Sequence, residues 1–504
     1  MKKILSIQQL AEKVADLKKS GKTVVLCHGV FDLMHPGHIR HLQTAKKEGD
    51  ILVVTVTPDR YVNKGPGRPV FSENLRAETL AALGAVDYAA VNEWPNAVET
   101  LKTVKPSVYI KGSDYAAPDQ DITGGIALEK EAVESVGGQL RFTNDIQFSS
   151  TALLNRFFGT FPEPTRQWLQ DFRARHSPDS VIDAMRALKK LRVLVVGDVI
   201  VDEYHYCSGL GKSPKDNIIT TRYLGEERFA GGALACANHL AGFCEEVTLV
   251  TCLGGMQTHE DYIRLNLKPN IRPEFFVRPD TCTVVKRRFV EPVFLTKLFE
   301  VAFLDDRPLP DDVCAGMAAH LERIAGDYDL VLVSDFGHGL VDERIIGALK
   351  NARFLTVNAQ SNSANHGYNL VTKYHKADYI CIDEPELRLA SHDKYGDIHA
   401  LIKGLSQKLD CPCISITRGH LGAITYRREL GFFETPVFSG KIVDRVGAGD
   451  SYLSVTAPMA AAGLTPDLIG FTGNAAAAIK VGIVCNKQSV EPLPLFRFIN
   501  TLLK

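Results

Sequence analysis

The sequence has almost no excess charge, because 58 lysine and arginine residues are balanced by 59 aspartate and glutamate residues, giving a formal net charge of −1. Without a basic excess there is no overall field to attract nucleic acid, so anions must be bound by local loops. The sequence also contains no motif that reads RNA or DNA. Nucleic acid is therefore not an expected partner.

Long hydrophobic runs are also missing. A helix that crosses a membrane needs about eighteen consecutive apolar residues, and no such run occurs. The alanine run at residues 475–478 is short and is soon followed by Lys480. The N-terminus leads into a polar, charged helical pattern over residues 8–19, which lacks the apolar core of a signal peptide. We expect no membrane partner and a cytoplasmic location.

Cysteines in zinc-binding spacing are missing as well. The eleven cysteines are scattered, and the one close pair is Cys411 and Cys413. This pattern favours free thiols in a reducing compartment over a structural metal. The chain has no internal repeat and no low-complexity tract. Its 504 residues, 45% hydrophobic and 23% charged, are typical of globular protein and too many for one core, so two or three domains are expected.

Short apolar runs alternate with helical patterns along the chain. The expected strands are residues 23–26, 51–56, 107–110, 192–196, 246–250, 329–333, 354–357 and 413–416. This alternation predicts the α/β class, with two parallel-sheet domains in sequence. Residues 158–190 break the pattern with prolines and a charged helical stretch. We interpret them as a helical connector between domains at 1–157 and 191–504.

The most informative segment is Phe31–His38, FDLMHPGH, which follows the apolar run 24–26. A strand that ends in a glycine-containing turn before a helix presents free backbone N–H groups to an anion. His35 and His38 lie three residues apart, on one helical face, so both imidazoles can reach the same phosphate chain. There they would stabilise charge on departing pyrophosphate. The alternative is a helix start with two incidental histidines.

Later segments of the same domain fit this interpretation. Lys64 lies in a basic, turn-rich loop, and Arg76 opens a helical pattern that runs on to residue 88. Lys111 follows the strand 107–110. The hydroxyl-rich residues 149–151 precede another expected helix, whose start can hold phosphate.

Residues 22–157 resemble the nucleotidylyltransferase superfamily with its HxGH motif. In the order of their motifs they are similar to the nucleotidylyltransferase half of the bifunctional heptose-phosphate kinase/heptose 1-phosphate adenylyltransferase family. The resemblance implies a Rossmann-like fold and catalytic roles for His35 and His38. It implies nucleotide binding by His28, Gly29, Phe31, Lys64, Arg76, Lys111, Ser149, Ser150 and Thr151. His28 departs from the family, which more often has asparagine in this turn.

A second group of chemistry-bearing residues lies in the C-terminal part. Asp198 and Asp202 follow the strand 192–196, at the carboxyl end where α/β sheets bind ligands. The segment 444–450, DRVGAGD, places small residues at a helix start, which makes an anion hole for a moving phosphoryl group. Asp450 beside it can take the proton of an attacking hydroxyl. A lone GxGD can equally be a glycine turn with a capping aspartate.

Residues 190–504 resemble ribokinase-type (PfkB) sugar kinases, most closely the heptose branch. The resemblance implies a ribokinase-like α/β fold with a small β lid from residues 203–228 and 283–305, and a homodimer or higher homo-oligomer through that lid. It implies Asp450 as the base. The nucleotide-binding and anion-hole residues implied by the resemblance are Thr417, Gly419, Gly447, Ala448, Gly449 and Asn474. Its sugar-binding residues are Asp198, Asp202, Gly231, Gly232, Asn238 and Lys286. Its Mg²⁺-associated residues are Glu386 and Asp383.

Three departures from the family stand out. Asp383 replaces the asparagine of the family's NxxE motif, His338 stands where lysine is usual, and the order of the domains is reversed. The expected function is a two-activity enzyme of nucleotide-sugar synthesis that uses sugar phosphates, ATP and Mg²⁺. Three alternatives stay open: CTP as the nucleotide of the transferase, another phosphosugar or polyol as substrate, or a transferase whose kinase domain is regulatory and inactive.

Overall fold

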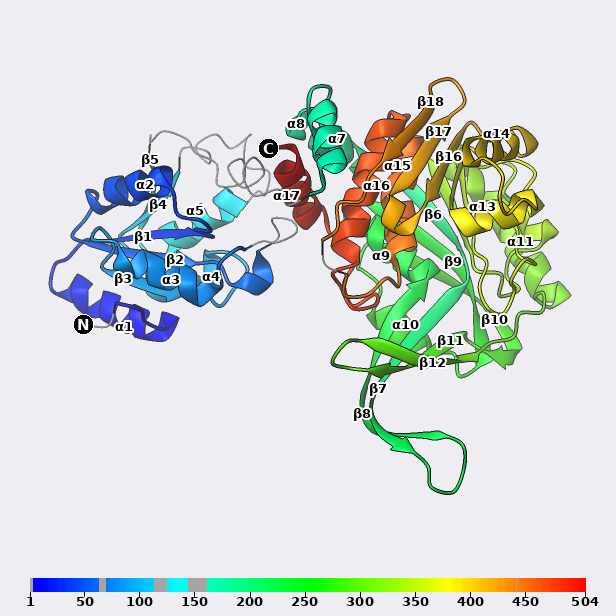
Figure 1. Cartoon of the computed structure of the whole chain (residues 1–504), viewed down its shortest axis with the longest axis horizontal. Helices are drawn as coiled ribbons and strands as arrows, with labels where there is room; N and C mark the ends of the chain where they lie inside the picture. The colour runs from blue at the N-terminus through cyan, green and yellow to red at the C-terminus, as the bar shows by residue number, and fades with distance from the viewer. Residues whose placement is uncertain (1–2, 63–68, 113–124, 144–160, 441) are drawn as a thin grey trace. The chain divides into compact units, whose positions relative to one another are not determined.

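The computed structural model describes residues 3–62, 69–112, 125–143, 161–440 and 442–504. The chain forms two compact units, one comprising Met1–Glu163 with Phe496–Lys504 and the other Pro164–Leu495 (Figure 1). Each unit has its own sheet, so the chain has two α/β units, as the fold class predicts. Within the described ranges, no helix has the length and apolar character needed to cross a membrane.

The sheet of the first unit is parallel, and its described strands run in the order β3-β2-β1-β4-β5. The strands are β1 (Val24–Gly29), β2 (Ile51–Val56), β3 (Tyr88–Val91), β4 (Val108–Gly112) and β5 (Gln139–Thr143). The central strand β1 carries the buried run 24–27, as expected for a strand covered on both faces. Because chain order reverses beside β1, the carboxyl ends of β1 and β4 define the expected ligand position.

Helices cover both faces of this sheet. One face packs against α2 (Pro36–Lys46) and α3 (Glu73–Ala82), and the other against α1 (Ile7–Lys19), α4 (Val98–Val104) and α5 (Gly125–Ser135). A short 3₁₀ turn, η1 (Asp59–Tyr61), follows β2. The helix predicted to run from Arg76 to residue 88 is too long, because α3 ends at Ala82 and residues 88–91 pair with β2 as a strand.

The large sheet of the second unit has the described order β10-β9-β6-β13-β14-β15-β16-β17-β18. Its strands are β6 (Arg192–Gly197), β9 (Glu246–Met256), β10 (Ile271–Cys282), β13 (Leu330–Asp335), β14 (Leu355–Ala359), β15 (Tyr379–Asp383), β16 (Cys413–Thr417), β17 (Ala423–Arg427) and β18 (Gly431–Thr435). The pairings are parallel from β10 through β16, and β17 and β18 are antiparallel. The carboxyl ends of the parallel strands therefore share one edge.

Two groups of helices enclose this sheet (Figure 1). One face carries α9 (Ala233–Phe243), α15 (Ala448–Ala461) and α16 (Pro466–Lys480). The other carries α11 (Asp311–Ile324), α12 (Glu343–Ala348), α13 (Glu384–Ser391) and α14 (Ile398–Lys408). The remaining elements are α10 (Glu260–Leu265), α17 (Pro492–Leu503) and the 3₁₀ turns η4 (Leu188–Lys190), η5 (Ala325–Asp327), η6 (Val371–Lys373) and η7 (Gly419–Leu421).

The predicted connector is helical where it is described. It forms α7 (Glu163–Arg173) and α8 (Pro178–Ala187), while residues 158–160 lie outside the described part. The ring of Trp168 stacks on Phe172 and Phe471, and its Nε1 donates a hydrogen bond to the carbonyl of Glu434 at 2.8 Å. These aromatic contacts bind α7 to the second unit.

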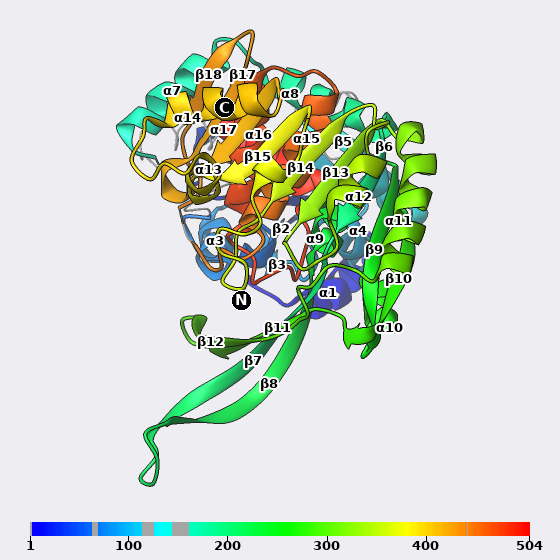
Figure 2. The same ribbon diagram turned by 90° about the vertical axis from the view of Figure 1, so that its right-hand side faces the viewer.

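A separate sheet, which we call the lid, has the strand order β12-β11-β7-β8. It comprises β7 (Val199–Lys212), β8 (Ile219–Gly232), β11 (Val285–Glu291) and β12 (Thr296–Phe303). Figure 2 shows β7 and β8 extending as a long ribbon away from the large sheet. The lid strands overlap the two predicted segments, 203–228 and 283–305, and every residue of the edge strand β12 is exposed.

Candidate functional site

His28 is the second-last residue of β1, and its imidazole lies between two threonines. Its Nδ1 is 2.9 Å from the Thr55 hydroxyl and its Nε2 is 3.2 Å from the Thr57 hydroxyl. Burial, assisted by the charge of Lys111, lowers the pKa of His28 to about 3, so the ring is neutral near pH 7. His28 thus ties β1 to the segment after β2, and its predicted contact with nucleotide stays a prediction.

His35 and His38 lie together at the start of α2. Nδ1 of His35 accepts hydrogen bonds from the backbone N–H groups of Gly37 at 3.1 Å and His38 at 3.4 Å, so His35 is the N-cap of the helix. Because Nδ1 accepts, the proton of the neutral ring is on Nε2. Burial lowers the pKa of His35. The two rings stack with centroids 3.9 Å apart. The motif thus presents a pair of imidazoles, as the spacing predicts.

A tight turn supports this pair. Phe31 has φ of +48°, and its ring meets that of His38 edge-on at 5.5 Å. A Cβ on Gly29 would come within 3.1 Å of the Phe31 ring, so glycine lets the ring fold back. The buried carboxylate of Asp32 accepts hydrogen bonds from the N–H groups of Val70 and Phe71 at 2.9–3.2 Å. Sequence reasoning missed this role of Asp32, because its partners are nearly forty residues away.

Arg76, predicted to bind nucleotide, is 1% exposed. Its guanidinium donates to the carbonyls of Val30, Phe71 and Thr57 at 2.5–2.9 Å and forms an ion pair with Asp59. These contacts engage each of its nitrogens. In this structure Arg76 therefore holds the loops around the turn together, and the contacts give no support to nucleotide binding by its side chain.

Lys111, near the end of β4, has a counter-ion on α5. Its Nζ lies 3.0 Å from Oε2 of Glu129, which also accepts a 2.9 Å hydrogen bond from the Tyr109 hydroxyl. Glu129 thus holds the ammonium group of Lys111 at the edge where a ligand is expected. Four other predicted residues, Lys64, Ser149, Ser150 and Thr151, lie outside the described residues, so their roles stay predictions.

In the second unit, acidic and amide side chains gather where the parallel strands end. Asp198 follows β6, and its Oδ2 accepts hydrogen bonds from the N–H groups of Phe336 at 2.8 Å and His338 at 3.4 Å. Burial, with the nearby charge of Asp335, raises the pKa of Asp198 to about 7. Asp198 lies directly after β6, and its predicted contact with sugar stays a prediction; the loop that it holds was not predicted.

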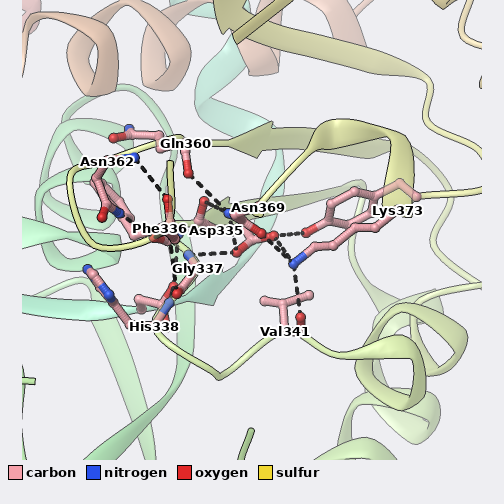
Figure 3. A network of polar contacts seen from close by, with 12 residues as sticks. Asp335, Phe336, Gly337, His338, Val341, Gln360, Asn362, Asn369 and Lys373 are labelled. Carbon is pink, nitrogen blue, oxygen red and sulfur yellow. Dashed lines mark hydrogen bonds and ion pairs between the residues drawn. The ribbon is translucent and has the colours of Figure 1, made fainter. Parts of the chain in front are cut away.

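Asp335 is the centre of a buried polar network. Figure 3 shows Lys373 and Asn369 converging on its carboxylate. Lys373 pairs with Oδ2 at 2.6 Å and the Tyr374 hydroxyl donates to the same oxygen at 2.8 Å, while Asn369 and the Gly337 N–H donate to Oδ1. The network fixes the loop 336–339 that carries His338. The His338 ring is buried, and both its nitrogens lack a hydrogen-bond partner in the described part of the chain.

The paired glycines allow close approach of one carboxylate and one backbone carbonyl. A Cβ on Gly231 would lie 2.2 Å from Oδ2 of Asp202, and one on Gly232, at φ +57°, would lie 2.4 Å from the carbonyl oxygen of Asp198. Neither position therefore has room for a larger side chain. Asp202 forms an ion pair with Arg288 of β11.

Lys286 of β11 stands opposite Asp202 in the lid register. Its Nζ lies 5.5 Å from the centre of the Phe336 ring and makes no ion pair with any described residue. Burial lowers its pKa, and the charges of Asp202 and Asp198 oppose that shift. A half-buried ammonium beside two carboxylates, with no direct partner, can receive an anionic substrate group.

The segment 444–450 forms the predicted helix start. Gly447 is the N-cap of α15 with φ of +80°, and a Cβ there would lie 2.2 Å from Oδ1 of Asn486. No side chain among the described residues caps the helix. The Ala448 N–H donates to the carbonyl of Arg445 at 3.3 Å, whereas the N–H groups that follow, from Gly449 onward in the first turn, are placed to bind an anion.

Asp450 lies in the first turn of α15 and is 8% exposed. Nε2 of Gln360, just after β14, donates a 3.1 Å hydrogen bond to its Oδ1. Burial, together with the charge of Asp202, raises the pKa of Asp450 to about 6. A carboxylate with that pKa is ionised near neutrality and can accept a proton from a hydroxyl. Gln360 was missed in the sequence, although the strand before it was predicted.

The Asp383–Glu386 pair forms a capping box on α13. The Asp383 carboxylate accepts from the Glu386 N–H at 2.8 Å, and the Glu386 carboxylate accepts from the N–H groups of Asp383 at 2.8 Å and Ser361 at 3.0 Å. Burial raises the pKa of both groups, that of Glu386 to about 8. Two adjacent half-buried carboxylates are suited to a divalent cation.

The described residues contain no cluster of three or more metal-ligating side chains. Mg²⁺ is commonly held by one or two carboxylates together with substrate phosphates, so the Asp383–Glu386 pair fits a magnesium–nucleotide complex. Such a cation would neutralise phosphate charge.

The other predicted kinase residues are engaged in different ways. Thr417, at the end of β16, stands opposite Asp383 in register, and Gly419, at φ +55°, begins η7. Nδ2 of Asn474 donates to the carbonyls of Thr435 and Pro436. Asn238 donates to the carbonyl of Asn266 and accepts from the N–H of Lys268, so both ends of its amide fasten that loop. These contacts do not support sugar binding by Asn238.

Fold and site together define a carbohydrate-kinase unit and a nucleotidylyltransferase-like unit in one chain. Residues 190–484 match the family model described as pfkB family carbohydrate kinase, which covers more than half of the sequence. The chain therefore belongs to the pfkB family. Residues 26–156 match the model described as cytidylyltransferase-like.

Among curated proteins, the chain is similar to the bifunctional protein HldE of several bacteria. It is 37% identical over 149 residues to that of Syntrophotalea carbinolica and 35% identical over 161 residues to that of Gluconobacter oxydans. The matches cover 28% and 32% of this chain, and 29% and 32% of the relatives. The chain thus spans less than a third of the length of these relatives.

Among solved structures, a mutant of phosphofructokinase-2 from Escherichia coli matches with a TM-score of 0.51 at 15% identity. The tetrameric inhibited form of the same enzyme matches with a TM-score of 0.50 at 14% identity. Each match covers 62% of this chain and all of the other. At this identity the likeness shows the fold, which is the predicted ribokinase-like one.

Proposed function

We propose that the chain is a bifunctional enzyme of nucleotide-sugar synthesis. The second unit transfers a phosphoryl group from ATP to a hydroxyl of a sugar phosphate resembling heptose 7-phosphate. The first unit transfers a nucleotidyl group from ATP to a sugar 1-phosphate, with release of pyrophosphate and an ADP-heptose-like product. The family membership, the similarity to proteins named HldE and the motif resemblance support this proposal.

The observation that carries the proposal is the position of Asp450 in the first turn of α15, behind amides that no side chain caps. In the kinase step, the sugar hydroxyl gives its proton to the Asp450 carboxylate while its oxygen bonds to the γ-phosphorus of ATP, and ADP leaves. The amides of residues 447–449 stabilise the transferring group. Asp198, Asp202 and Lys286 hold the sugar phosphate, and Asp383 and Glu386 hold magnesium.

In the transferase step no protein nucleophile is required. An oxygen of the sugar 1-phosphate bonds to the α-phosphorus of the triphosphate, and the bond to pyrophosphate breaks. His35 and His38 donate hydrogen bonds to the phosphates, and Lys64 with residues 149–151 completes the positioning. The neutral His35, with its proton on Nε2, is suited to that role.

Two alternative functions have specific support. The match of residues 26–156 to a cytidylyltransferase-like model favours testing CTP. The replacements at Asp383 and His338 favour testing whether the kinase unit binds ATP without turning it over, as a regulatory module would.

We further propose a homo-oligomer assembled through the lid, in the cytoplasm. Large apolar side chains are exposed on the lid: Leu210, Ile218, Ile219, Tyr223, Leu224, Leu298, Phe299, Val301 and Phe303. Burying such a surface against a second copy favours association. All eleven cysteines are free, which suits a reducing compartment.

The test is a substrate screen with purified protein. Six- and seven-carbon phosphosugars are combined with ATP or CTP, and phosphorylated sugar and pyrophosphate are measured separately. We expect phosphorylation with ATP, and pyrophosphate release with ATP and a sugar 1-phosphate. Pyrophosphate release with CTP but not ATP would refute the nucleotide assignment. ATP binding without phosphorylation of any sugar would establish the regulatory alternative.

A further inference from the structure

Lys480, at the end of α16, is a completely buried lysine directly beneath the anion-binding loop. Its side chain is 0% exposed. Its Nζ donates to the carbonyl oxygen of Val446 at 2.8 Å and to that of Cys485. Within the described residues it makes no ion pair with a carboxylate, so the charge is held by carbonyl dipoles from two separate loops.

The same two peptide segments are held from the other side by Asp444. Its Oδ1 accepts from the N–H of Val446 at 3.1 Å, and its Oδ2 accepts from the N–H of Cys485 at 2.9 Å. The carboxylate binds the N–H groups, and the ammonium binds the carbonyls, of the same two residues. We call this set of four hydrogen bonds the Asp444–Lys480 clamp. It fastens the loop before α15 to the loop after α16.

The clamp lies against the N-cap of α15. A Cβ on Gly447 would be 3.0 Å from Cε of Lys480, so the lysine stem passes immediately beside the N-cap residue. The carbonyl of Val446, which Lys480 binds, belongs to the peptide whose nitrogen is that of Gly447. Moving the ammonium would therefore move the amides that form the predicted anion hole.

We propose that Lys480 is a positioning residue for phosphoryl transfer: its tethered ammonium is a built-in cation that holds the loop 444–447 and places fixed positive charge beneath the phosphate site. The proposal rests on the proposed kinase function for its catalytic part. Its structural part is independent of that function: the carbonyl oxygens of Val446 and Cys485 form a binding site for a cation, which we call the cation seat.

Several charged or titratable groups surround this seat. They are Asp444 in the loop before α15, Asp450 on α15, Asp202 on β7, the thiol of Cys485 and the imidazole of His239 on α9. The charge of Lys480 lowers the pKa of Asp450 against the raising effects of burial and Asp202. Removing the charge should therefore move the acid limb of the kinase rate to higher pH.

The test compares two variants. Lys480→Ala leaves an empty seat lined by the carbonyls of Val446 and Cys485, whereas Lys480→Met fills the same space without charge. Carbonyl and carboxylate oxygens are ligands for small monovalent cations. Thermal unfolding and kinase rate are measured in potassium or ammonium chloride and in tetramethylammonium chloride at equal ionic strength. Lys487→Ala, an exposed lysine of the same region, is the control.

We expect both Lys480 variants to lose about tenfold to a hundredfold in kcat, as when a residue that supports a charged site is removed. Potassium or ammonium should raise the unfolding midpoint and kcat of Lys480→Ala, and should leave Lys480→Met and the wild type unchanged. A Lys480→Ala protein that unfolds at the same temperature in every salt would overturn the cation seat. If the wild type phosphorylates no sugar, the kinase proposal fails, but the salt-dependent midpoint still decides the seat.

Discussion

The two candidate anion sites are both helix starts, yet they are built in opposite ways. In the first unit the helix start is capped by a side chain, because Nδ1 of His35 accepts from the amides of Gly37 and His38. In the second unit none of the described side chains caps α15, and the loop before it is held from behind by Asp444 and Lys480.

This difference determines which atoms are available to a phosphate. A capped helix start offers the side chains of the cap, here two stacked imidazoles, whereas an uncapped start offers its backbone amides. We infer that the transferase depends on imidazole side chains, and that the kinase depends on backbone geometry and on one carboxylate. Substitutions should therefore damage the two units in different ways.

The largest effect is expected for Asp450→Asn. The amide has no basic oxygen to take the proton of the sugar hydroxyl, so kinase kcat should fall by about 10²- to 10⁴-fold. Pyrophosphate release by the first unit should not change. Both rates are measured on the same preparation. Retention of more than half of the kinase rate would show that Asp450 is not the base.

His38→Ala should have the next largest effect, and on the other reaction. Losing one donor to the developing pyrophosphate charge should lower nucleotidyl transfer by about 10²- to 10³-fold and leave phosphorylation intact. His41→Ala, another histidine of α2, is the matched control and should lose far less. Equal losses in the two variants would contradict a specific role of the imidazole pair.

The pH dependence of the kinase gives a finer test. Because the pKa of Asp450 is raised to about 6, the rate should increase as pH rises through about 6, where the carboxylate forms. Gln360→Met removes a hydrogen bond that lowers this pKa, so the acid limb should move to higher pH. The titration of the substrate phosphate is common to both proteins and cancels. If the kinase rate rises at the same pH in both proteins, the ionisation of Asp450 does not control the rate.

Strand positions and motif spacing were predictable, since both are local. The expected strand 51–56 is β2, and the histidine pair lies together because its members share one helical turn. β15 was not recognised, although its last residue, Asp383, was singled out. Local patterns identify a buried strand only when its apolar run is distinct from the neighbouring helices.

Long-range side-chain partners were not predictable. The arrangement of Asp335 with Lys373 and the clamp of Asp444 with Lys480 depend on tertiary packing that no spacing reveals. For the same reason, Arg76 and Asn238 were assigned to ligands before their backbone partners were known. Motif reasoning singled out these residues, and the structure shows that Arg76 and Asn238 hold loops together.

Backbone geometry in the kinase site can be tested with glycine variants. Gly447→Ala should lower the free energy of unfolding by about 1–3 kcal/mol, because its φ is +80° and its Cβ would meet Asn486 at 2.2 Å. A Cβ on Gly449 meets nothing within 4 Å, so Gly449→Ala is the matched control. Urea unfolding measures both. Equal stability of the two variants would contradict the described turn.

The smallest expected effect concerns the stability contribution of Glu386. Its pKa is raised to about 8 in the folded state, so the folded protein holds this proton more tightly than the unfolded chain does. That stability is fully present below the ordinary glutamate pKa and is lost as pH rises through about 8. Glu386→Gln should therefore reduce the fall in unfolding free energy between pH 5 and 8. Glu322→Gln, on the exposed side of α11, should leave the fall unchanged.

The central claim is that each unit handles a different bond of the same nucleotide. The most direct measurement supplies ATP labelled at either the α- or the γ-phosphate to the wild type, Asp450→Asn and His38→Ala, together with the phosphosugars found by the screen. The account predicts that γ-label enters the sugar unless Asp450 is changed, and that α-label enters the nucleotide sugar unless His38 is changed. Loss of both transfers in either single variant, or retention of both, would contradict it.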